Sequence, residues 1–226
     1  MKYLKLFESF EEGDESLSES SDLTSLSESI ESICKKLNIR NWSVNSDGTV
    51  DVDGDVIIYN KGLTELPLKF GEVSGSFHCN YNKLTSLEGA PSRVGDNFSC
   101  EDNYLTTLEF APIYVGGNFN CGWNKLTGLE GGPKEVDGGY ICNHNALISL
   151  SGMPIKLGSG EFWVKISCYD NPIYEVYKLF LSHNDFIDSL DYNYLRGTNI
   201  VESRFQEALD ELGIEMPESI PGYKYI

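Results

Sequence analysis

The sequence predicts a repeat solenoid of the α/β class, built from about six coils of about 21 residues each. Four cysteines recur at one constant interval, and each begins the same frame, C-x-x-N-x-L-x-x-L: Cys79, Cys100, Cys121 and Cys142. A fixed period of about 20 residues indicates stacked coils that contact only their neighbours. Such stacks usually present an elongated binding surface rather than a catalytic pocket.

Other columns of residues keep the same period and fix the phase of the repeat. They are Val73, Val94, Val115 and Val136; Phe77, Phe98, Phe119 and Tyr140; the leucine pairs of the frame; and Pro91, Pro112, Pro133 and Pro154. One period earlier, a first coil is expected to begin near Val52, with Lys61 in the place of the asparagine. One period later, the pattern fits only if five residues are inserted near residues 158–162.

The repeat frame has a physical explanation in each column. A short parallel strand should place Phe98 and Cys100 on its inner side, because side chains alternate across a strand. Asn103 can then pair the buried backbone groups of the turn that follows. The loss of one such asparagine should cost roughly 1–3 kcal/mol.

The frame resembles the leucine-rich repeat, L-x-x-L-x-L-x-x-N/C-x-L, with a wider gap after the first position. The matching residues are Val94, Phe98, Cys100, Asn103 and Leu105. More narrowly, the chain is similar to a group of largely uncharacterised leucine-rich repeat proteins encoded by tailed bacteriophages. That similarity covers MKYLKLFESF (1–10), SDGTVDVDGDV (46–56), GLTELPLKFG (62–71) and NPIYEVYKLF (171–180). The resemblance implies a right-handed coil and a phage origin, and it brings no catalytic residues.

The segments outside the repeats suggest four regions. Residues 1–20 are rich in serine and acid and are expected to be a flexible tail. Residues 21–51 are expected to form an N-terminal cap: a helix from Asp22 to Leu37, then hairpin strands with turns at Asp47-Gly48 and Asp53-Gly54. The solenoid follows over 52–171. Residues 172–226 are expected to form a helical C-terminal cap, with helices over 172–183, 185–192 and 199–212 and a stop at Gly213.

Charge and cysteine content limit the classes of function. The net charge is −18, to which residues 1–31 contribute −7 and residues 172–226 contribute −6, so the ends are acidic. Direct nucleic-acid binding is not expected, because there is no basic patch. The chain shows neither a secretory signal peptide nor an apolar run long enough to span a membrane, so it is expected in the cytoplasm, which is that of the host cell if the chain is phage-encoded. The cysteines are therefore expected to be reduced core residues. A disulfide or metal role for the cysteines is the weaker alternative.

No cofactor, metal or enzymatic activity is predicted. The acidic cluster Asp47, Asp51, Asp53 and Asp55 lacks the glutamate of an EF-hand, so turn aspartates are favoured over a calcium site. His78 and His144 lie three repeats apart, too far for direct pairing.

The outward positions of the strands are the candidate protein-binding residues, because aromatic side chains there make good anchors. They are Tyr59, His78, Tyr81, Glu101, Asp102, Asn120, Trp123, Ile141, His144, Tyr169 and Asp170. The rings could instead simply cover strand edges.

Three functions remain open from the sequence. The first is a protein-binding module for a host or viral protein. The second is an acidic inhibitor that mimics nucleic acid and binds a DNA- or RNA-binding defence protein of the host in place of its nucleic acid. The third is a packaged virion protein with a cleavable leader, since Leu6-Phe7-Glu8, Leu17-Ser18-Glu19 and Leu26-Ser27-Glu28 are similar to L-x-E sites of phage maturation proteases. The sequence does not indicate an oligomeric state.

Overall fold

The computed structural model describes residues 29–148, 152–154, 156–157, 171, 174–177, 195–196, 199–211, 213–221 and 223–226. The chain divides into two compact units, residues 1–38 and 39–226. In the first unit a helix covers residues 29–37, and Ile30 and Cys34, one turn apart, are buried as the predicted apolar stripe requires. The expected tail, the L-x-E segments and the start of the predicted helix lie outside the described residues. In the described part, no helix combines the length and apolar character needed to cross a membrane.

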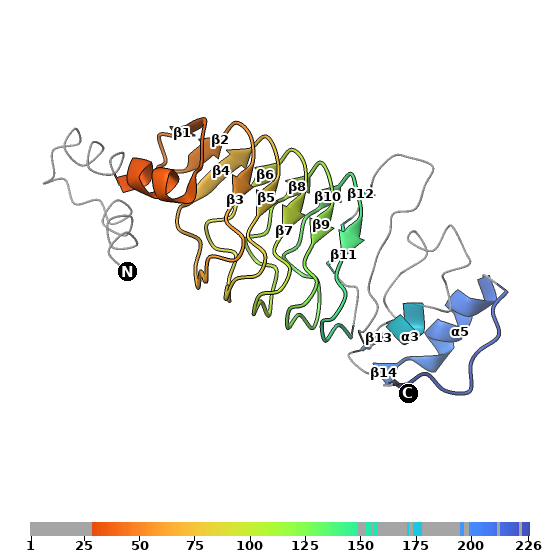
Figure 1. Ribbon diagram of the computed structural model, residues 1–226. Helices are drawn as coiled ribbons and strands as arrows, with labels where there is room; N and C mark the ends of the chain where they lie inside the picture. The colour runs from red at the N-terminus through yellow and green to blue at the C-terminus, as the bar shows by residue number, and fades with distance from the viewer. Residues whose placement is uncertain are drawn as a thin grey trace, which may run out of the picture. The chain divides into compact units, whose positions relative to one another are not determined.

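The second unit contains a solenoid in which each of the first five coils adds one strand to each of two sheets, and the described part of the sixth coil adds Lys156–Leu157 to one of them (Figure 1). The seven-stranded sheet has the order β1-β2-β4-β6-β8-β10-β12, and the five-stranded sheet has the order β11-β9-β7-β5-β3. The seven-stranded sheet consists of β1 (Trp42–Val44), β2 (Val50–Val52), β4 (Phe70–Val73), β6 (Arg93–Val94), β8 (Tyr114–Val115), β10 (Glu135–Val136) and β12 (Lys156–Leu157). The five-stranded sheet consists of β3 (Val56–Ile57), β5 (Phe77–His78), β7 (Phe98–Ser99), β9 (Phe119–Asn120) and β11 (Tyr140–Ile141).

Strands of successive coils pair in parallel, and paired residues lie one repeat period apart, as Phe98 does from Phe119. Val56 pairs with Phe77, so the first coil lies where the sequence places it. The prediction of a repeat solenoid with about six turns and parallel strands is confirmed. We number the coils 1 to 6 by their ladder residue: Lys61, Asn82, Asn103, Asn124, Asn145 and Asn171.

The solenoid differs from the predicted α/β class, because residues 39–148 contain strands and turns and no helix. It is therefore a β-solenoid with two strands per coil where one was expected. The rest of each repeat consists of turns, bends and irregular backbone. The additional strands, such as Arg93–Val94, are two residues long, too short for alternation to reveal them.

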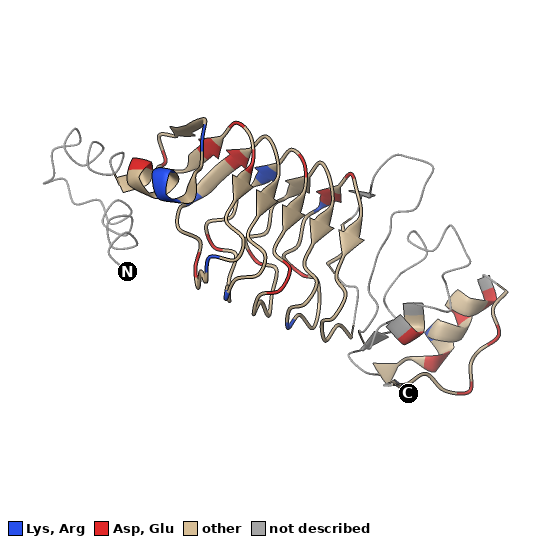
Figure 2. Ribbon diagram, in the orientation of Figure 1, with Lys and Arg blue, Asp and Glu red and all other residues tan. Residues whose placement is uncertain are grey.

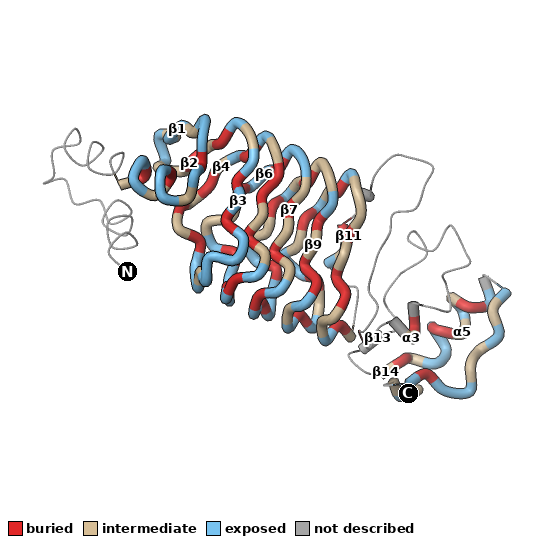
Figure 3. The backbone as a smooth tube through the Cα atoms, in the orientation of Figure 1, coloured by how far each residue is buried: buried red, intermediate tan, exposed pale blue. Residues whose placement is uncertain are grey.

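The core runs along the inside of the coils as columns of identical residue types (Figure 3). Phe77, Phe98 and Phe119 are fully buried, and their rings stack with centroids 5.6 Å apart. The valine, cysteine and leucine columns are also fully buried from coil 3 to coil 5, where they are described. This packing explains why the four cysteines of the frame repeat: each fills the same small site beside a phenylalanine or tyrosine.

The asparagine ladder ties each coil to the one before it. Asn103 Oδ1 accepts the Leu84 N–H at 2.9 Å, and its Nδ2 donates to the carbonyls of Cys79, Cys100 and Glu101. Asn124 and Asn145 repeat this pattern one and two coils later. The predicted pairing of buried backbone groups is confirmed, with the addition that the asparagine reaches back one coil.

The ladder also locates the insertion in the last coil. Leu157 pairs with Val136, one repeat period earlier, so β12 keeps the register of the array. Asn171 takes the next ladder position after Asn145 and accepts the Leu147 N–H at 3.0 Å, although it stands one period plus five residues along the chain. The five extra residues therefore lie between Leu157 and Asn171. This agrees with the sequence, although the expected insertion at residues 158–162 is itself outside the described residues.

The two predicted hairpin turns have different outcomes. β1 pairs antiparallel with β2 around Asp47-Gly48, which confirms the first turn. The second prediction is wrong: Asp53-Gly54 joins β2 to β3, which belong to different sheets. Gly54, at φ +128°, turns the chain at the corner of the coil. An Asp-Gly pair favours a tight turn in both settings, so the dipeptide alone does not distinguish a corner from a hairpin.

The C-terminal residues form α3 (Tyr174–Tyr177), β13 (Leu195–Arg196), β14 (Asn199–Ile200), α5 (Glu202–Glu211) and β15 (Lys224–Tyr225). The predicted helix over 199–212 starts later than expected, because Asn199 and Ile200 pair with β13 and β15 in a three-stranded sheet. Phe205 and Leu209 are buried, as the apolar stripe predicts. Gly213, at φ +67°, ends α5 as expected. The helix expected over 185–192 lies outside the described residues.

Candidate binding surface

Each coil leaves the five-stranded sheet through one residue in the left-handed backbone region. These residues are Asn60, Tyr81, Asp102, Trp123 and His144, with φ between 51° and 55°; we call them the left-handed column. Their backbone is held by the next coil: the Tyr81 N–H donates to the Glu101 carbonyl at 2.9 Å, and the Trp123 N–H donates to the Asn143 carbonyl at 2.9 Å. The side chains of Tyr81 and Trp123 are half exposed, at 50% and 53%.

Two side chains of this column are unfavourable choices for the backbone they occupy. A residue other than glycine loses roughly 1–2 kcal/mol in the left-handed region, and asparagine and aspartate tolerate it best. Asn60 and Asp102 fit that preference, whereas Tyr81 and Trp123 are bulky residues for which such a φ is an outlier. The fold therefore gains nothing locally from aromatic residues here, and such outliers often mark functional positions.

Two rings of the column stack on each other between adjacent coils. Trp123 and His144 belong to adjacent coils, and their rings stack with centroids 3.8 Å apart and planes at 27°. Because the line between adjacent coils follows the solenoid axis, one face of the Trp123 ring is covered by His144. The opposite face is turned towards the neighbouring coil, which carries Asp102.

The strand face beside the column is mostly polar and uncharged. None of the five strands of this sheet carries Lys, Arg, Asp or Glu (Figure 2). His78, Asn120 and Ile141 share one register position and are half-buried. The Asn120 Nδ2 donates to Glu101 Oε2 at 3.1 Å, which fixes the Glu101 carboxylate next to the column. Asp102 and Glu101 therefore supply the negative charge of this surface.

The remaining predicted residues are placed as follows. Tyr59 lies one position before Asn60 in coil 1 and is 50% exposed. Tyr169 and Asp170 lie outside the described residues. His78 and His144 stand in coils 2 and 5, separated by β7 and β9, as their sequence spacing requires.

A neighbouring outward column has a structural role that the sequence does not reveal. Asp55 Oδ1 accepts the Ser76 N–H, Asn97 Oδ1 accepts the Asn118 N–H, and Asn118 Oδ1 accepts the Gly139 N–H, at 2.7–2.9 Å. These side chains form a second ladder between coils. Their regular spacing was visible in the sequence, but only the structure shows that the side-chain oxygens turn to the next coil.

The side chains of the acidic cluster Asp47, Asp51 and Asp53 also accept hydrogen bonds, within a turn or from the next coil. Asp47 accepts the Thr49 N–H and hydroxyl, and these bonds lower its pKa. Asp51 accepts the Glu72 N–H, and Asp53 accepts the Ser74 hydroxyl. Within the described residues, no group of three or more His, Cys, Asp or Glu side chains is arranged to hold a metal ion. The structure agrees with the preference for turn aspartates.

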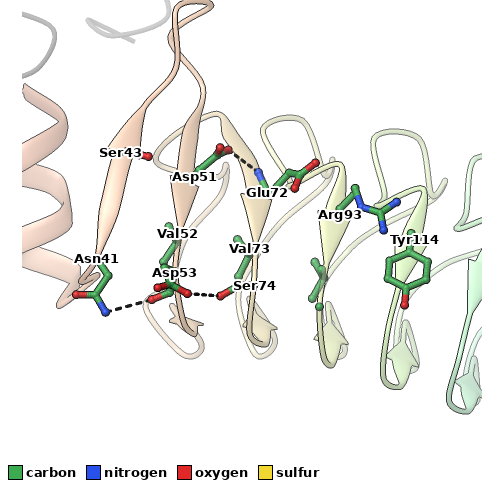
Figure 4. A pocket seen from close by; sticks show the side chains of 12 residues that line it. Asn41, Ser43, Asp51, Val52, Asp53, Glu72, Val73, Ser74, Arg93 and Tyr114 are labelled. Atoms are coloured by element: carbon green, nitrogen blue, oxygen red, sulfur yellow. Dashed lines mark hydrogen bonds between the residues drawn. The ribbon is translucent and has the colours of Figure 1, made fainter.

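A hollow of about 310 Å³ lies on the outer side of the seven-stranded sheet (Figure 4). Asp51, Asp53 and Glu72 line one part of it, and Arg93 and Tyr114 line another. Two of the carboxylates make the bonds just described, and the Arg93 guanidinium lies 4.4 Å from the centre of the Tyr114 ring. The polar groups of the hollow are thus mainly engaged with adjacent coils.

Sequence reasoning missed one exposed apolar pair, Phe110 and Ile113, which are 59% and 57% exposed. Phe110 has φ +67° and stands where the adjacent repeats carry Gly89 and Gly131. The signal was present in the sequence, because phenylalanine replaces glycine at this one position of the repeat.

The cysteines of the frame are free and buried. Burial raises the pKa of the Cys79 thiol to about 12 and raises the pKa of Cys100 and Cys121 well above the usual value. Thiols of this kind react slowly, since the thiolate is the reactive form. Packing accounts for the cysteine column without further chemistry.

Comparisons of the chain with protein-family models, with curated proteins and with solved structures found no match.

Proposed function

We propose that this protein is a non-enzymatic interaction module that binds a protein through the left-handed column and the adjoining outward residues of the five-stranded sheet. One observation carries the proposal: Tyr81 and Trp123 are half-exposed aromatic residues held at left-handed positions, where asparagine or glycine would serve the fold better. Aromatic anchors supply large contact area at low entropic cost. Selection for binding would explain their presence.

The arrangement of the coil supports this assignment. Inward side chains form the core, and Asn103 and Asn97 tie adjacent coils together. The half-exposed side chains of Tyr81 and Trp123 belong neither to the buried core nor to the asparagine ladder, although Trp123 stacks on His144. The surface can therefore be specialised without disturbing the fold.

The proposal includes the finer points of the sequence resemblance. We propose that the solenoid is of the leucine-rich-repeat kind, that the segments flanking it cap its ends, and that the protein is phage-encoded. It would then act in the cytoplasm of the infected cell on a host or viral protein.

The test replaces both anchors with the residue that coil 1 carries at the same position. The Tyr81→Asn/Trp123→Asn protein should fold and lose a partner that the unchanged protein captures from infected cells. Phe110→Gly is the matched control, because it also removes an exposed aromatic from a left-handed position, but outside the proposed surface. If the double variant retains the partner, or if Phe110→Gly loses it equally, the proposed surface is wrong.

A second candidate, the acidic inhibitor, is favoured by the net charge of −18. It predicts that capture of a basic nucleic-acid-binding protein depends on the acidic ends and is weakened by salt. Neutralising the acidic residues of 1–31 and 172–226 should abolish capture, whereas Tyr81→Asn/Trp123→Asn should not. The two variants therefore distinguish the two functions.

A further inference from the structure

Adjacent coils of this solenoid bring cations onto aromatic rings. The Arg93 guanidinium lies 4.4 Å from the centre of the Tyr114 ring, and the Lys125 ammonium lies 4.8 Å from the centre of the Tyr104 ring. In both pairs the partners lie one repeat period apart and occupy equivalent columns of adjacent coils. The spacing between coils thus suits a cation–π contact, which requires about 6 Å or less.

In the left-handed column a residue with a carboxylate, Asp102, lies one coil from an aromatic residue on each side. Asp102 is exposed between Tyr81 of the preceding coil and Trp123 of the following coil. Strands in a sheet are about 4.8 Å apart, so a group placed over Asp102 would lie about 5 Å from both rings. The Trp123 face not covered by His144 is turned to this side. Among the described residues, no cation–π contact joins a Lys or Arg to the Tyr81 or Trp123 ring.

We propose that Tyr81, Asp102 and Trp123 form a receptor for an arginine side chain of the protein partner. This inference rests on the proposed function and names the chemistry of its central contact. A guanidinium can donate hydrogen bonds to the Asp102 carboxylate and present its faces to the two rings. Glu101, held by Asn120, adds a second negative charge beside the site.

Charge complementarity favours arginine over an apolar or acidic occupant. The surface carries Asp102 and Glu101, and the whole chain has a net charge of −18, which attracts a basic segment before contact. Arginine is preferred to lysine because its planar group stacks on aromatic rings and bonds a carboxylate at the same time.

The experiment selects random dodecapeptides on the full-length protein, with counter-selection on Tyr81→Asn/Trp123→Asn. Selected peptides are synthesised with arginine and with citrulline, which has nearly the same shape and no charge. The arginine peptide should bind with a Kd about tenfold lower than that of the citrulline peptide, and the ratio of the two Kd values is the measured quantity. Asp102→Asn should reduce this ratio to near one, and it suits the left-handed backbone. Glu109→Gln removes the same charge from an exposed turn of the same coil and should leave the ratio unchanged.

The outcomes separate the inference from the proposed function. If peptides require Tyr81 and Trp123 but bind equally with citrulline, the arginine receptor is wrong and the binding surface stands. If Asp102→Asn and Glu109→Gln change the ratio equally, the effect is general charge and the inference fails. If no peptide depends on Tyr81 and Trp123, both the surface and the receptor are rejected. Melting temperatures no lower than that of the unchanged protein show that the variants are folded.

Discussion

Replacement of Asn103 by alanine should lower the free energy of unfolding by about 2.5–6 kcal/mol. Asn103 is 3% exposed and makes four hydrogen bonds, one accepted and three donated. The size of the effect depends on which of its partners keep another bond.

The three carbonyls all retain a second donor. Cys79 O also accepts from Asn82, Cys100 O also accepts from Asn124, and Glu101 O also accepts the Tyr81 N–H. Only the Leu84 N–H, in a buried residue, would lose its hydrogen bond altogether. An orphaned buried donor costs about 1–3 kcal/mol, and the three lost secondary bonds add about 0.5–1 kcal/mol each. These contributions give the stated range.

Urea unfolding followed by circular dichroism measures the total, and amide hydrogen exchange at Leu84 measures the local effect. Asn97→Ala is the matched control: it is the same substitution in the same coil, but Asn97 is half-buried, its Oδ1 accepts a single N–H, and its Nδ2 donates only to the exposed Asp96 carboxylate. Its cost should not exceed about 1 kcal/mol. Equal costs for the two variants, or unchanged protection of the Leu84 amide in Asn103→Ala, would refute the reasoning.

Three further predictions concern the core, the column and the thiols. Gly132→Ala should cost about 1 kcal/mol, because the added Cβ would lie 3.0 Å from both the Tyr140 hydroxyl and the Leu129 carbonyl oxygen. Tyr140→Phe should recover the part of the loss that the hydroxyl causes, measured by thermal unfolding, since other coils pair alanine with phenylalanine. A double variant no better than Gly132→Ala alone would contradict this. Tyr81→Asn should raise stability by about 1 kcal/mol by relieving the left-handed backbone; a fall in melting temperature would count against strain at this position. In the folded protein the pKa of the Cys79 thiol is raised from 9.0 to about 12. The contribution of the protonated thiol to the free energy of unfolding is therefore fully present below pH 9 and is lost as the pH rises towards 12. Urea unfolding at several pH values between 9 and 12 gives the decrease of the free energy of unfolding with pH. This decrease should be smaller by about 1.4 kcal/mol per pH unit in Cys79→Ala than in the unchanged protein, and equal decreases would show that the Cys79 pKa does not affect stability.

The solenoid was predictable because its strongest signals are periodic. The spacing of Cys100 and Asn103 recurs often enough to fix the phase, the first coil and the five-residue insertion. Each column also has a local physical cause, such as the burial of Phe98 or the paired turn at Asn103. The residues that recur with the period are also those that packing and hydrogen bonding require at their positions, so the core and the asparagine ladder could be predicted from the sequence.

The features that escaped depend on contacts between coils. Strands such as Arg93–Val94 are too short for a pattern, and their pairing partners lie in the neighbouring coils. Asn97 looks like an exposed polar residue until its bond to the next coil is seen. The left-handed φ of Trp123 has no signature in its own side chain, although Asn60 and Asp102 in the same column hinted at it. The outward residues of the candidate surface could therefore be named, but their geometry could not.

The backward reach of the ladder has a consequence for how such a protein changes over generations. Each ladder asparagine bonds its own coil and the preceding one, as Asn124 does at Cys121 and Cys100. A duplicated unit of one whole period would bring all of its partners with it, whereas any other length would shift the ladder residues out of register with the preceding coil. Recombination between repeats could thus lengthen or shorten the array by whole coils, each adding one new residue to the left-handed column. The binding surface can therefore gain or lose a contact position while the interior of every coil stays the same.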